Sequence, residues 1–287
     1  MFNSNKKKKI LIILLLLSIL ILYFSDRIMD IIFSFFKSIK SDIYTKKIPV
    51  FTFHRLVPDD VKQKFFPYYQ WIGSIKIFEK MIKYLYDNGY KTINTTEFYS
   101  WYIGKVEYKK KTVLVTIDDG FYEDYYLVYP IIKKYNFKAT SFIIGSKIKE
   151  KTLPYDKYKN LFLGMDVINK VREEYPYFEF QSHSYNMHFI NITNKTKLVC
   201  RINSMSNEEL EKDIFQNKKF GFTSMSYPYG CFNEEMKKML EMKGYLISFR
   251  FGPSNYATRN SERFAIPRIK LDGFATVDTL KNWLKNI

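Results

Sequence analysis

An apolar run that ends in two adjacent aspartates is the feature that most restricts how this chain can fold. The segment "TVLVTIDDG", residues 112–120, carries no charge before Asp118 and Asp119, and we expect it to be a buried strand. Two carboxylates at the end of a buried strand require something that offsets their desolvation and mutual repulsion. A divalent cation is the simplest candidate. Capping of a following helix at "GFYEDYY" is the alternative, but it accounts for only one aspartate.

From residue 47 onward, short β-branched or aromatic runs alternate with amphipathic stretches, which predicts an α/β domain with parallel strands. We expect a distorted (β/α) barrel of about seven parallel strands, and we interpret residues 146–176 as an insertion near its rim. Strands are predicted over residues 48–54, 112–120, 138–145, 177–183, 222–230, 245–251 and 264–271, and helices over 75–89, 125–136, 206–219 and 234–244.

Polar residues gather at the carboxyl ends of these predicted strands. In parallel α/β folds, ligands bind and chemistry occurs at that face, so we expect these side chains to share one site. They are His54, Asp118 with Asp119, His183, and Tyr229 with Gly230.

The segment "QSHSYNMH", residues 181–188, holds two of the three histidines of the chain, five positions apart. Taken alone, His183 and His188 fit a functional pair no better than they fit solvated loop residues or satisfied partners at the edge of a core. Beside Asp119 they complete one carboxylate and two imidazoles, the three-ligand arrangement of hydrolytic zinc sites.

Three motifs, "TIDDG", "SHSYNMH" and "SYPYG", occur in this order between "VFTFHRL" upstream and "FAIPRIKL" downstream. As a set they resemble the polysaccharide deacetylases, carbohydrate esterase family four, from residue 48 to about residue 270. These are metal-dependent enzymes on a distorted barrel that remove acetyl groups from N-acetylated sugars in polymers. The five-residue histidine spacing is most similar to the poly-β-1,6-N-acetylglucosamine deacetylases.

The resemblance implies a role for each motif residue. Asp118 is expected to be the general base, and Asp119, His183 and His188 to hold a divalent metal. We expect the metal to be zinc, and cobalt, nickel and manganese are the alternatives. The backbone N–H of Tyr229 is expected to donate to the oxyanion.

Two departures from the family pattern change the expected roles. Ser226 stands where the family has an arginine that orients the base, and we expect Arg268 to take that role; a surface or barrel-bottom salt bridge is the alternative. No histidine follows His188, so His54 or the metal itself is expected to assist the leaving amine. Trp71, Tyr185 and Phe251 are either rim residues that stack on sugars or core residues.

The expected reaction is hydrolysis of an acetamide on an N-acetylglucosamine polysaccharide, of exopolysaccharide or cell wall. The alternatives are a non-catalytic polysaccharide-binding protein on the same barrel, and an O-acetyl esterase or peptidoglycan deacetylase. Oligomeric state stays open. The net charge of +17 suggests an anionic partner, but no basic stripe or nucleic-acid module accompanies it, and we expect no nucleic-acid binding.

The N-terminus predicts membrane attachment. Lys6 to Lys9 precede the uncharged apolar stretch 10–24, which is shorter than the about 20 residues of a typical span. We expect residues 1–40 to form a basic cytoplasmic stub and a signal anchor in the cell membrane, with the catalytic domain, 41–287, outside the cytoplasm. Cleavage, which would give a secreted protein, is the alternative. The sequence is consistent with a disulfide between Cys200 and Cys231 or with two unpaired thiols.

Overall fold

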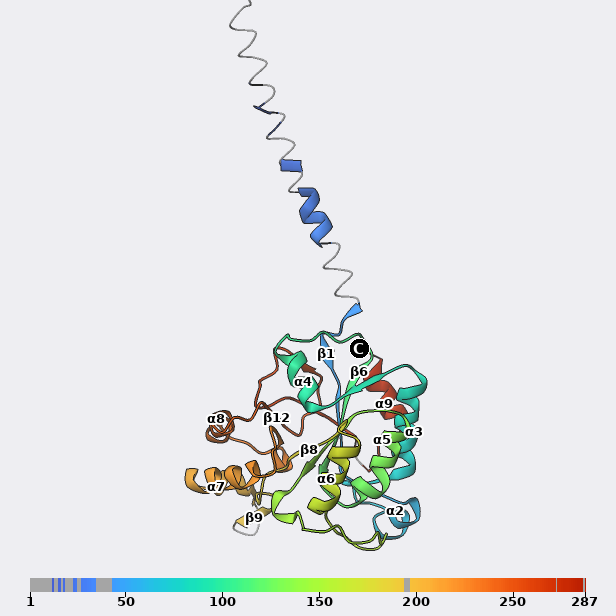
Figure 1. Cartoon of the computed structure of the whole chain (residues 1–287). Helices are drawn as coiled ribbons and strands as arrows, with labels where there is room; N and C mark the ends of the chain where they lie inside the picture. The colour runs from blue at the N-terminus through green and yellow to red at the C-terminus, as the bar shows by residue number, and fades with distance from the viewer. Residues whose placement is uncertain are drawn as a thin grey trace, which may run out of the picture. The chain divides into compact units, whose positions relative to one another are not determined.

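The computed structural model describes residues 43–193, 197–271, 273–285 and 287, together with 12, 15, 16, 18, 23, 24 and 27–34. The chain divides into two units, Met1–Tyr44 and Thr45–Ile287 (Figure 1). Most of the apolar stretch 10–24, and with it the predicted signal anchor, lies outside the described residues. Within the described residues, no helix has the length and apolar character that a membrane crossing requires.

A curved sheet of parallel strands forms the centre of the second unit. Its order is β12-β11-β8-β7-β6-β2-β14, and β5 pairs with the beginning of β6. A parallel bridge between Phe249 and Ile266 joins β12 to the segment before β14, so the two edges of the sheet meet in a distorted barrel. The strands are β2 (Val50–Phe53), β5 (Lys91–Ile93), β6 (Thr112–Asp119), β7 (Ala139–Ile143), β8 (Phe178–Ser182), β11 (Ser224–Ser226), β12 (Ile247–Phe249) and β14 (Ile269–Lys270).

The seven predicted parallel strands are confirmed. β5 was not predicted, because three residues are too few to show a strand pattern. Three antiparallel or parallel pairs lie outside the sheet: β1 (Lys47–Ile48) with β13 (Ala257–Thr258), β3 (Arg55–Val57) with β4 (Ile72–Ser74), and β9 (Ile190–Thr193) with β10 (Lys197–Cys200).

Helices connect the strands and cover the outside of the barrel (Figure 1). They are α2 (Asp59–Phe65), α3 (Ile75–Asp87), α4 (Thr95–Tyr102), α5 (Tyr129–Lys134), α6 (Met165–Glu174), α7 (Asn207–Lys218), α8 (Glu234–Met242) and α9 (Val277–Leu284). The helix predicted over 125–136 begins one residue earlier, as a π-helical turn (Asp124–Val128), before α5. The predicted capping box of Ser206 and Glu209 is present at the start of α7.

The interpretation of residues 146–176 as a rim insertion is wrong for its second half. Residues 165–174 form α6, the helix that connects β7 to β8, and Val167, Ile168 and Val171 are buried. The polar and aromatic residues before α6 concealed this helix. Only the segment between β7 and α6 fits the predicted insertion.

The alternation of side chains along β6 directs its carboxyl end toward the site. Val113, Val115 and Ile117 pack in the core between sheet and helices, whereas Leu114 belongs to a second core that also contains Phe142 and Phe249. Because successive side chains of a strand point to opposite faces, Asp118 lies on the same face as Leu114. The sheet geometry therefore places Asp118 above the inner core.

Replacement of Leu114 by alanine tests this inner core. Leu114 is fully buried, so Leu114→Ala should lower the free energy of unfolding by about 2–5 kcal/mol through lost transfer energy and a cavity. Leu153→Ala is the matched control because Leu153 is 55% exposed, and its effect should stay within about 0.5 kcal/mol. Urea denaturation of both variants measures the difference. Equal effects would contradict the assignment of Leu114 to a packed interior.

Candidate metal centre and active site

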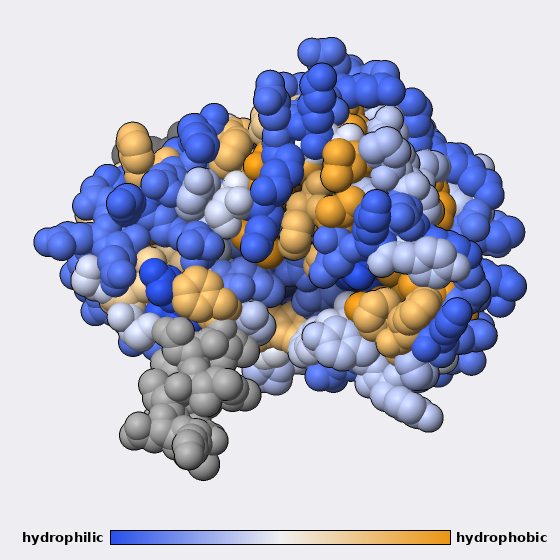
Figure 2. All heavy atoms as spheres, turned by 90° about the horizontal axis from the view of Figure 1, so that it is seen from below, coloured by the Kyte–Doolittle hydropathy of each residue, from blue (hydrophilic) through white to orange (hydrophobic). Residues whose placement is uncertain are grey.

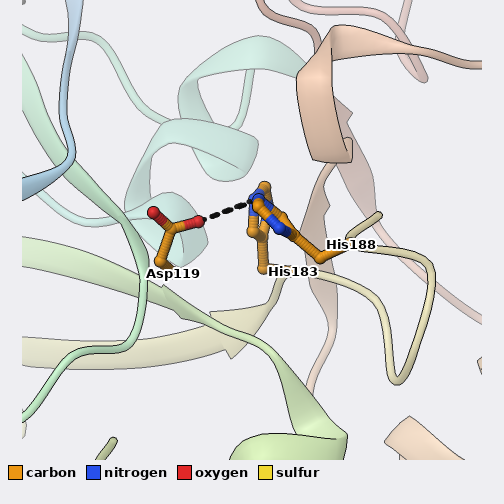
Figure 3. A group of neighbouring side chains, drawn as sticks. All are labelled: Asp119, His183 and His188. Atoms are coloured by element: carbon orange, nitrogen blue, oxygen red, sulfur yellow. Dashed lines mark ion pairs between the residues drawn. The ribbon is translucent and has the colours of Figure 1, made fainter. Parts of the chain in front are cut away.

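Asp119, His183 and His188 meet at the carboxyl ends of β6 and β8 (Figure 3). One ligand atom from each residue lies within 4.8 Å of the others. The Oδ1 atom of Asp119 is 3.0 Å from His188 Nε2 and 3.5 Å from His183 Nε2. Three side chains that the sequence separates by up to 69 positions (188 − 119) therefore converge on one point.

The donor atoms of this cluster fit a divalent metal. Asp119 Oδ1 is buried and accepts no hydrogen bond of normal geometry, although both imidazoles face it. Burial lowers the pKa of His183 to about 4, so its imidazole is neutral near pH 7. A carboxylate oxygen and two Nε2 atoms without another partner are the donor set of a hydrolytic zinc site.

Outer hydrogen bonds orient both imidazoles. His183 Nδ1 lies 2.9 Å from the carbonyl oxygen of Ser226, which can only accept, so Nδ1 carries the proton and Nε2 faces Asp119. His188 Nδ1 lies 3.4 Å from the Tyr229 hydroxyl, and the two rings are 4.7 Å apart. Although burial opposes it, the negative charge of Asp119 raises the pKa of His188.

Asp118 is paired with Arg268 in the interior. Arg268 Nη1 and Nη2 donate to the two carboxylate oxygens over 2.8 and 2.7 Å, and both residues are only 1% exposed. Burial alone would raise the pKa of Asp118, but the positive charge and the hydrogen bonds of Arg268 outweigh it and hold that pKa well below its usual range. Asp118 is therefore an ionised carboxylate next to the metal cluster.

Ser226 connects the base to the metal ligands. Its hydroxyl donates to Asp118 Oδ2 over 3.1 Å, accepts from Arg268 Nη2 over 2.9 Å, and lies 3.1 Å from His183 Nδ1. The side chain is fully buried. The residue that marks the departure from the family motif thus contacts both the predicted base and its replacement arginine.

A sharp turn after β6 separates the two aspartates. Asp119 has a φ of 86° and Gly120 a φ of 75°, so the strand leaves the sheet at once. A Cβ on Gly120 would lie 2.6 Å from Ile143 Cγ2, which leaves room only for glycine. This turn points Asp119 toward the histidines while Asp118 stays over the barrel interior.

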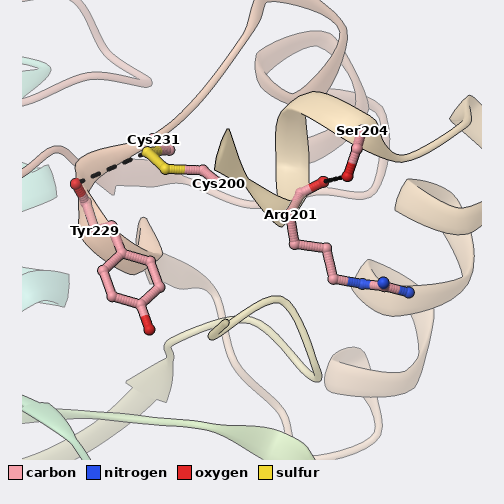
Figure 4. The surroundings of a disulfide bond; sticks show 5 residues. All are labelled: Cys200, Arg201, Ser204, Tyr229 and Cys231. Carbon is pink, nitrogen blue, oxygen red and sulfur yellow. Dashed lines mark hydrogen bonds between the residues drawn. A yellow bond between two sulfur atoms is a disulfide. The ribbon is translucent and has the colours of Figure 1, made fainter. Parts of the chain in front are cut away.

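The turn that carries Tyr229 is tied to the end of β10 by a disulfide (Figure 4). Tyr229 has a φ of 56° within the 3₁₀ turn Pro228–Gly230, and a Cβ on Gly230 would overlap the carbonyl oxygen of Phe251. Cys231 follows this turn and is bonded to Cys200 at the end of β10, with 6.3 Å between their Cα atoms. Of the two options open from the sequence, the structure has the disulfide.

His54 lies at the end of β2 among aromatic rings. Its ring centroid is 5.0 Å from that of Trp71 and 5.5 Å from that of Phe251. Burial lowers its pKa, against the charges of Asp119 and Asp118, which raise it. The imidazole makes no hydrogen bond to any residue that the structure describes, so its nitrogens are left for a ligand.

A small cavity next to α3 is lined by His54, Trp71, Gln70 and Phe53. Figure 2 shows the molecule from the side on which α2 and β9 lie in Figure 1, and pale and orange residues border a hollow near the middle of this face. Trp71 and Phe251 are both half-buried. His54 and Trp71 therefore line a cavity of their own, and the three predicted metal ligands are not among its lining residues.

Comparison with known proteins accords with this geometry. The polysaccharide deacetylase family profile matches residues 105–247. The poly-β-1,6-N-acetyl-D-glucosamine N-deacetylase of Staphylococcus aureus (strain MRSA252) is 30% identical over 213 residues, which cover 72% of this chain and 70% of that protein. The chain belongs to the polysaccharide deacetylase family.

Solved structures of low sequence identity share the fold of this family member. A de-N-acetylase from Aggregatibacter actinomycetemcomitans matches 83% of this chain and 99% of its own, with a TM-score of 0.68 and 20% identity. The Streptococcus pyogenes deacetylase PplD in complex with acetate matches 83% of this chain and 98% of its own, with a TM-score of 0.67 and 18% identity. The predicted barrel class therefore agrees with the folds of known deacetylases.

The structure brings most of the predicted site residues together. It groups the three predicted ligands and places Asp118 in contact with Arg268, so the alternative of a surface or barrel-bottom salt bridge for Arg268 is wrong. Sequence reasoning noted Ser226 only as a missing arginine and overlooked its hydroxyl. The one available signal was its place in "SYPYG", at the end of a predicted strand.

Replacement of Arg268 tests the buried pair. Arg268→Met leaves the Asp118 carboxylate buried without its charge partner, and we expect a loss of about 3–5 kcal/mol in the free energy of unfolding. Asp118→Asn combined with Arg268→Met removes the unpaired charge and should recover part of that loss. Urea denaturation of the two proteins gives the comparison. A loss below about 1 kcal/mol for Arg268→Met, as at exposed pairs, would be inconsistent with this pair.

Proposed function

We propose that this protein is a metal-dependent N-deacetylase of N-acetylglucosamine polysaccharide. The observation that carries the proposal is the ionised Asp118, held by Arg268, directly beside the Asp119–His183–His188 cluster. A protein that only binds polysaccharide has no need of a buried carboxylate with this pairing. Membership of the polysaccharide deacetylase family supports the same class of reaction.

In the proposed mechanism, the residues of this chain divide the work of amide hydrolysis. Asp119, His183 and His188 would hold a divalent metal, most simply zinc with cobalt, nickel or manganese as options, which when bound supplies Lewis-acid activation. Asp118 accepts a proton from the water that attacks the acetyl carbonyl carbon. The C–N bond then breaks, and acetate and a free amine are released.

Two further residues act on the oxygen and nitrogen of the scissile amide. The Tyr229 N–H, on a turn with a positive φ, donates to the oxyanion of the tetrahedral intermediate, a contact worth about 3–4 kcal/mol in other enzymes. His54, in its protonated imidazolium form, would donate a proton to the leaving amine; its ring nitrogens have no hydrogen-bond partner among the described residues. Arg268 orients Asp118 in place of the missing arginine at position 226.

The β-1,6-linked polymer is the substrate that we assign within this class. The assignment rests on the Staphylococcus aureus relative, whose name specifies poly-β-1,6-N-acetyl-D-glucosamine. The half-buried Trp71, which lines the cavity, and Phe251, which packs against it, would offer ring faces to pyranose units. O-acetylated polymers and peptidoglycan are the competing substrates that the assay must separate.

The proposed location is the outer side of the cell membrane. A signal anchor within residues 1–40 would hold the domain there, where an exported polymer is accessible. The Cys200–Cys231 disulfide supports an oxidising compartment, because disulfides are rare in the cytosol. A cleaved signal would give the same site in a secreted protein.

Acetate release from β-1,6-linked N-acetylglucosamine oligomers tests the reaction and the base together. Asp118→Asn should reduce turnover by about 10²–10⁴-fold, because the amide cannot accept the proton from water. The zinc content of the variant, measured by atomic emission, should equal that of the wild type. The control substrates are O-acetylated xylan and peptidoglycan.

The outcomes of this assay separate the rival functions. Metal binding without acetate release from any polymer would favour the non-catalytic binding protein. Faster release from acetylated xylan or peptidoglycan would keep the enzyme and replace the substrate. Undiminished turnover by Asp118→Asn would remove Asp118 from the mechanism.

Replacement of His54 tests the proposed general acid. His54→Ala should lower the turnover number by about 10²-fold or more, since the leaving amine loses its proton donor. Metal content should not change, because His54 is not among the three ligands. An activated substrate with a leaving amine of low pKa should recover much of the loss. Near-normal turnover on the polymer would exclude His54 from this role.

A further inference from the structure

The loop between the two predicted histidine ligands is held from outside the site by α7. The carboxylate of Asp213 accepts hydrogen bonds from the backbone N–H groups of Tyr185 and Asn186, each over 2.7 Å. Oδ1 accepts from Tyr185, and Oδ2 accepts from Asn186. These are two of the four residues that separate His183 from His188.

The other backbone groups of this loop are held as well. Gly145 N–H donates to the Ser184 carbonyl over 2.9 Å, and Ser146 N–H donates to the Tyr185 carbonyl over 2.8 Å. His183 N–H donates to the Ile143 carbonyl over 2.8 Å. The segment after β7 therefore fixes the carbonyl side of the loop, and α7 fixes its amide side.

The loop conformation makes an external anchor necessary. Ser184 has a φ of 63°, which an L-residue adopts at an energetic cost, so the loop would relax without contacts that hold it. A helix would present residues four apart on one face, whereas a spacing of five requires this irregular path. Two hydrogen bonds to one ionised group are the strongest restraint that the described part of the loop receives.

We propose that Asp213 is a positioning residue that sets the geometry of the metal centre by fixing the His183–His188 loop before any metal binds. The inference rests on the metal dependence contained in the proposed function, but not on the substrate. Asp213 touches neither histidine, so its effect passes through the backbone of Tyr185 and Asn186. Within the described residues, no hydrogen bond or ion pair links the Asp213 carboxylate to a predicted metal ligand.

Burial explains why this acid is more than a surface charge. Asp213 is 6% exposed, whereas its helical neighbours Glu211 and Lys212 are exposed. Burial raises its pKa to about 6, although the two backbone N–H groups and the charge of Arg201 oppose that rise. The desolvation cost of this buried carboxylate is offset because both of its oxygens accept hydrogen bonds.

An acid-to-amide substitution provides the test. Asp213→Asn keeps the size of the side chain but turns an NH₂ group toward one of the two backbone N–H donors. We expect zinc affinity, measured by competition with a chromophoric chelator, to fall about 10–100-fold, and the visible spectrum of the Co²⁺-loaded protein to change. Glu208→Gln is the matched control, because it makes the same charge change at an exposed position on α7.

These readouts distinguish positioning from a general contribution to stability. A merely structural role would lower the melting temperature of Asp213→Asn while the folded protein kept wild-type zinc affinity and the wild-type Co²⁺ spectrum, and that result would overturn the proposal. A wild type that releases no acetate would defeat the proposed function alone, because zinc affinity is measured without substrate.

Hydrogen exchange on the wild-type protein tests the same inference without any substitution, should Asp213→Asn not fold. The amides of Tyr185 and Asn186 should already be protected in the metal-free full chain, since Asp213 holds them there. Zinc should add little further protection at these two positions. Fast exchange without zinc, followed by protection on zinc binding, would show that the metal orders the loop and would contradict the proposal.

Discussion

The buried ion pair between Asp118 and Arg268 is the interaction on which the site depends. Asp118 ends β6, and Arg268 precedes β14, so the pair connects two strands on either side of β2 across the mouth of the barrel. Removing two charges from water is costly, and the pair tolerates it because both carboxylate oxygens and three guanidinium nitrogens have partners. The ion pair that keeps Asp118 charged thus also joins the two strands that flank β2.

This arrangement also shows how an arginine contacts Asp118 although position 226 holds a serine. Side chains from several strands meet in the interior of a parallel barrel, so a guanidinium can reach Asp118 from more than one strand. Here it arrives from the segment before β14, and the small Ser226 leaves space for it while its hydroxyl contacts Asp118. A large residue at position 226 would compete with Arg268 for the same buried volume.

The features that were predictable from the sequence are those with a local pattern. The apolar run of β6 and the motifs at strand ends predicted the parallel barrel, and they placed Asp118, Asp119, His183 and His188 at one face because parallel strands share a direction. The helix α6 was missed because the polar and aromatic residues before it resemble a loop. The contacts of Ser226 and Asp213 join residues 108 and 28 positions apart. Helical spacing places Asp213 on the buried face of α7 with Leu210 and Ile214, but it does not show which groups the carboxylate contacts.

The predicted ligands Asp119 and His188 are therefore held in place by different kinds of interaction. Asp119 sits at the end of a strand whose register with β7 is fixed by the core, so its position follows from packing that the hydrophobic pattern already encodes. His188 sits on an irregular loop, which has no register of its own and is held by hydrogen bonds that include those to Asp213, Gly145 and Ser146. A site assembled in this way keeps its carboxylate as long as the barrel is folded, whereas the placement of its second histidine depends on a few polar contacts outside the barrel core.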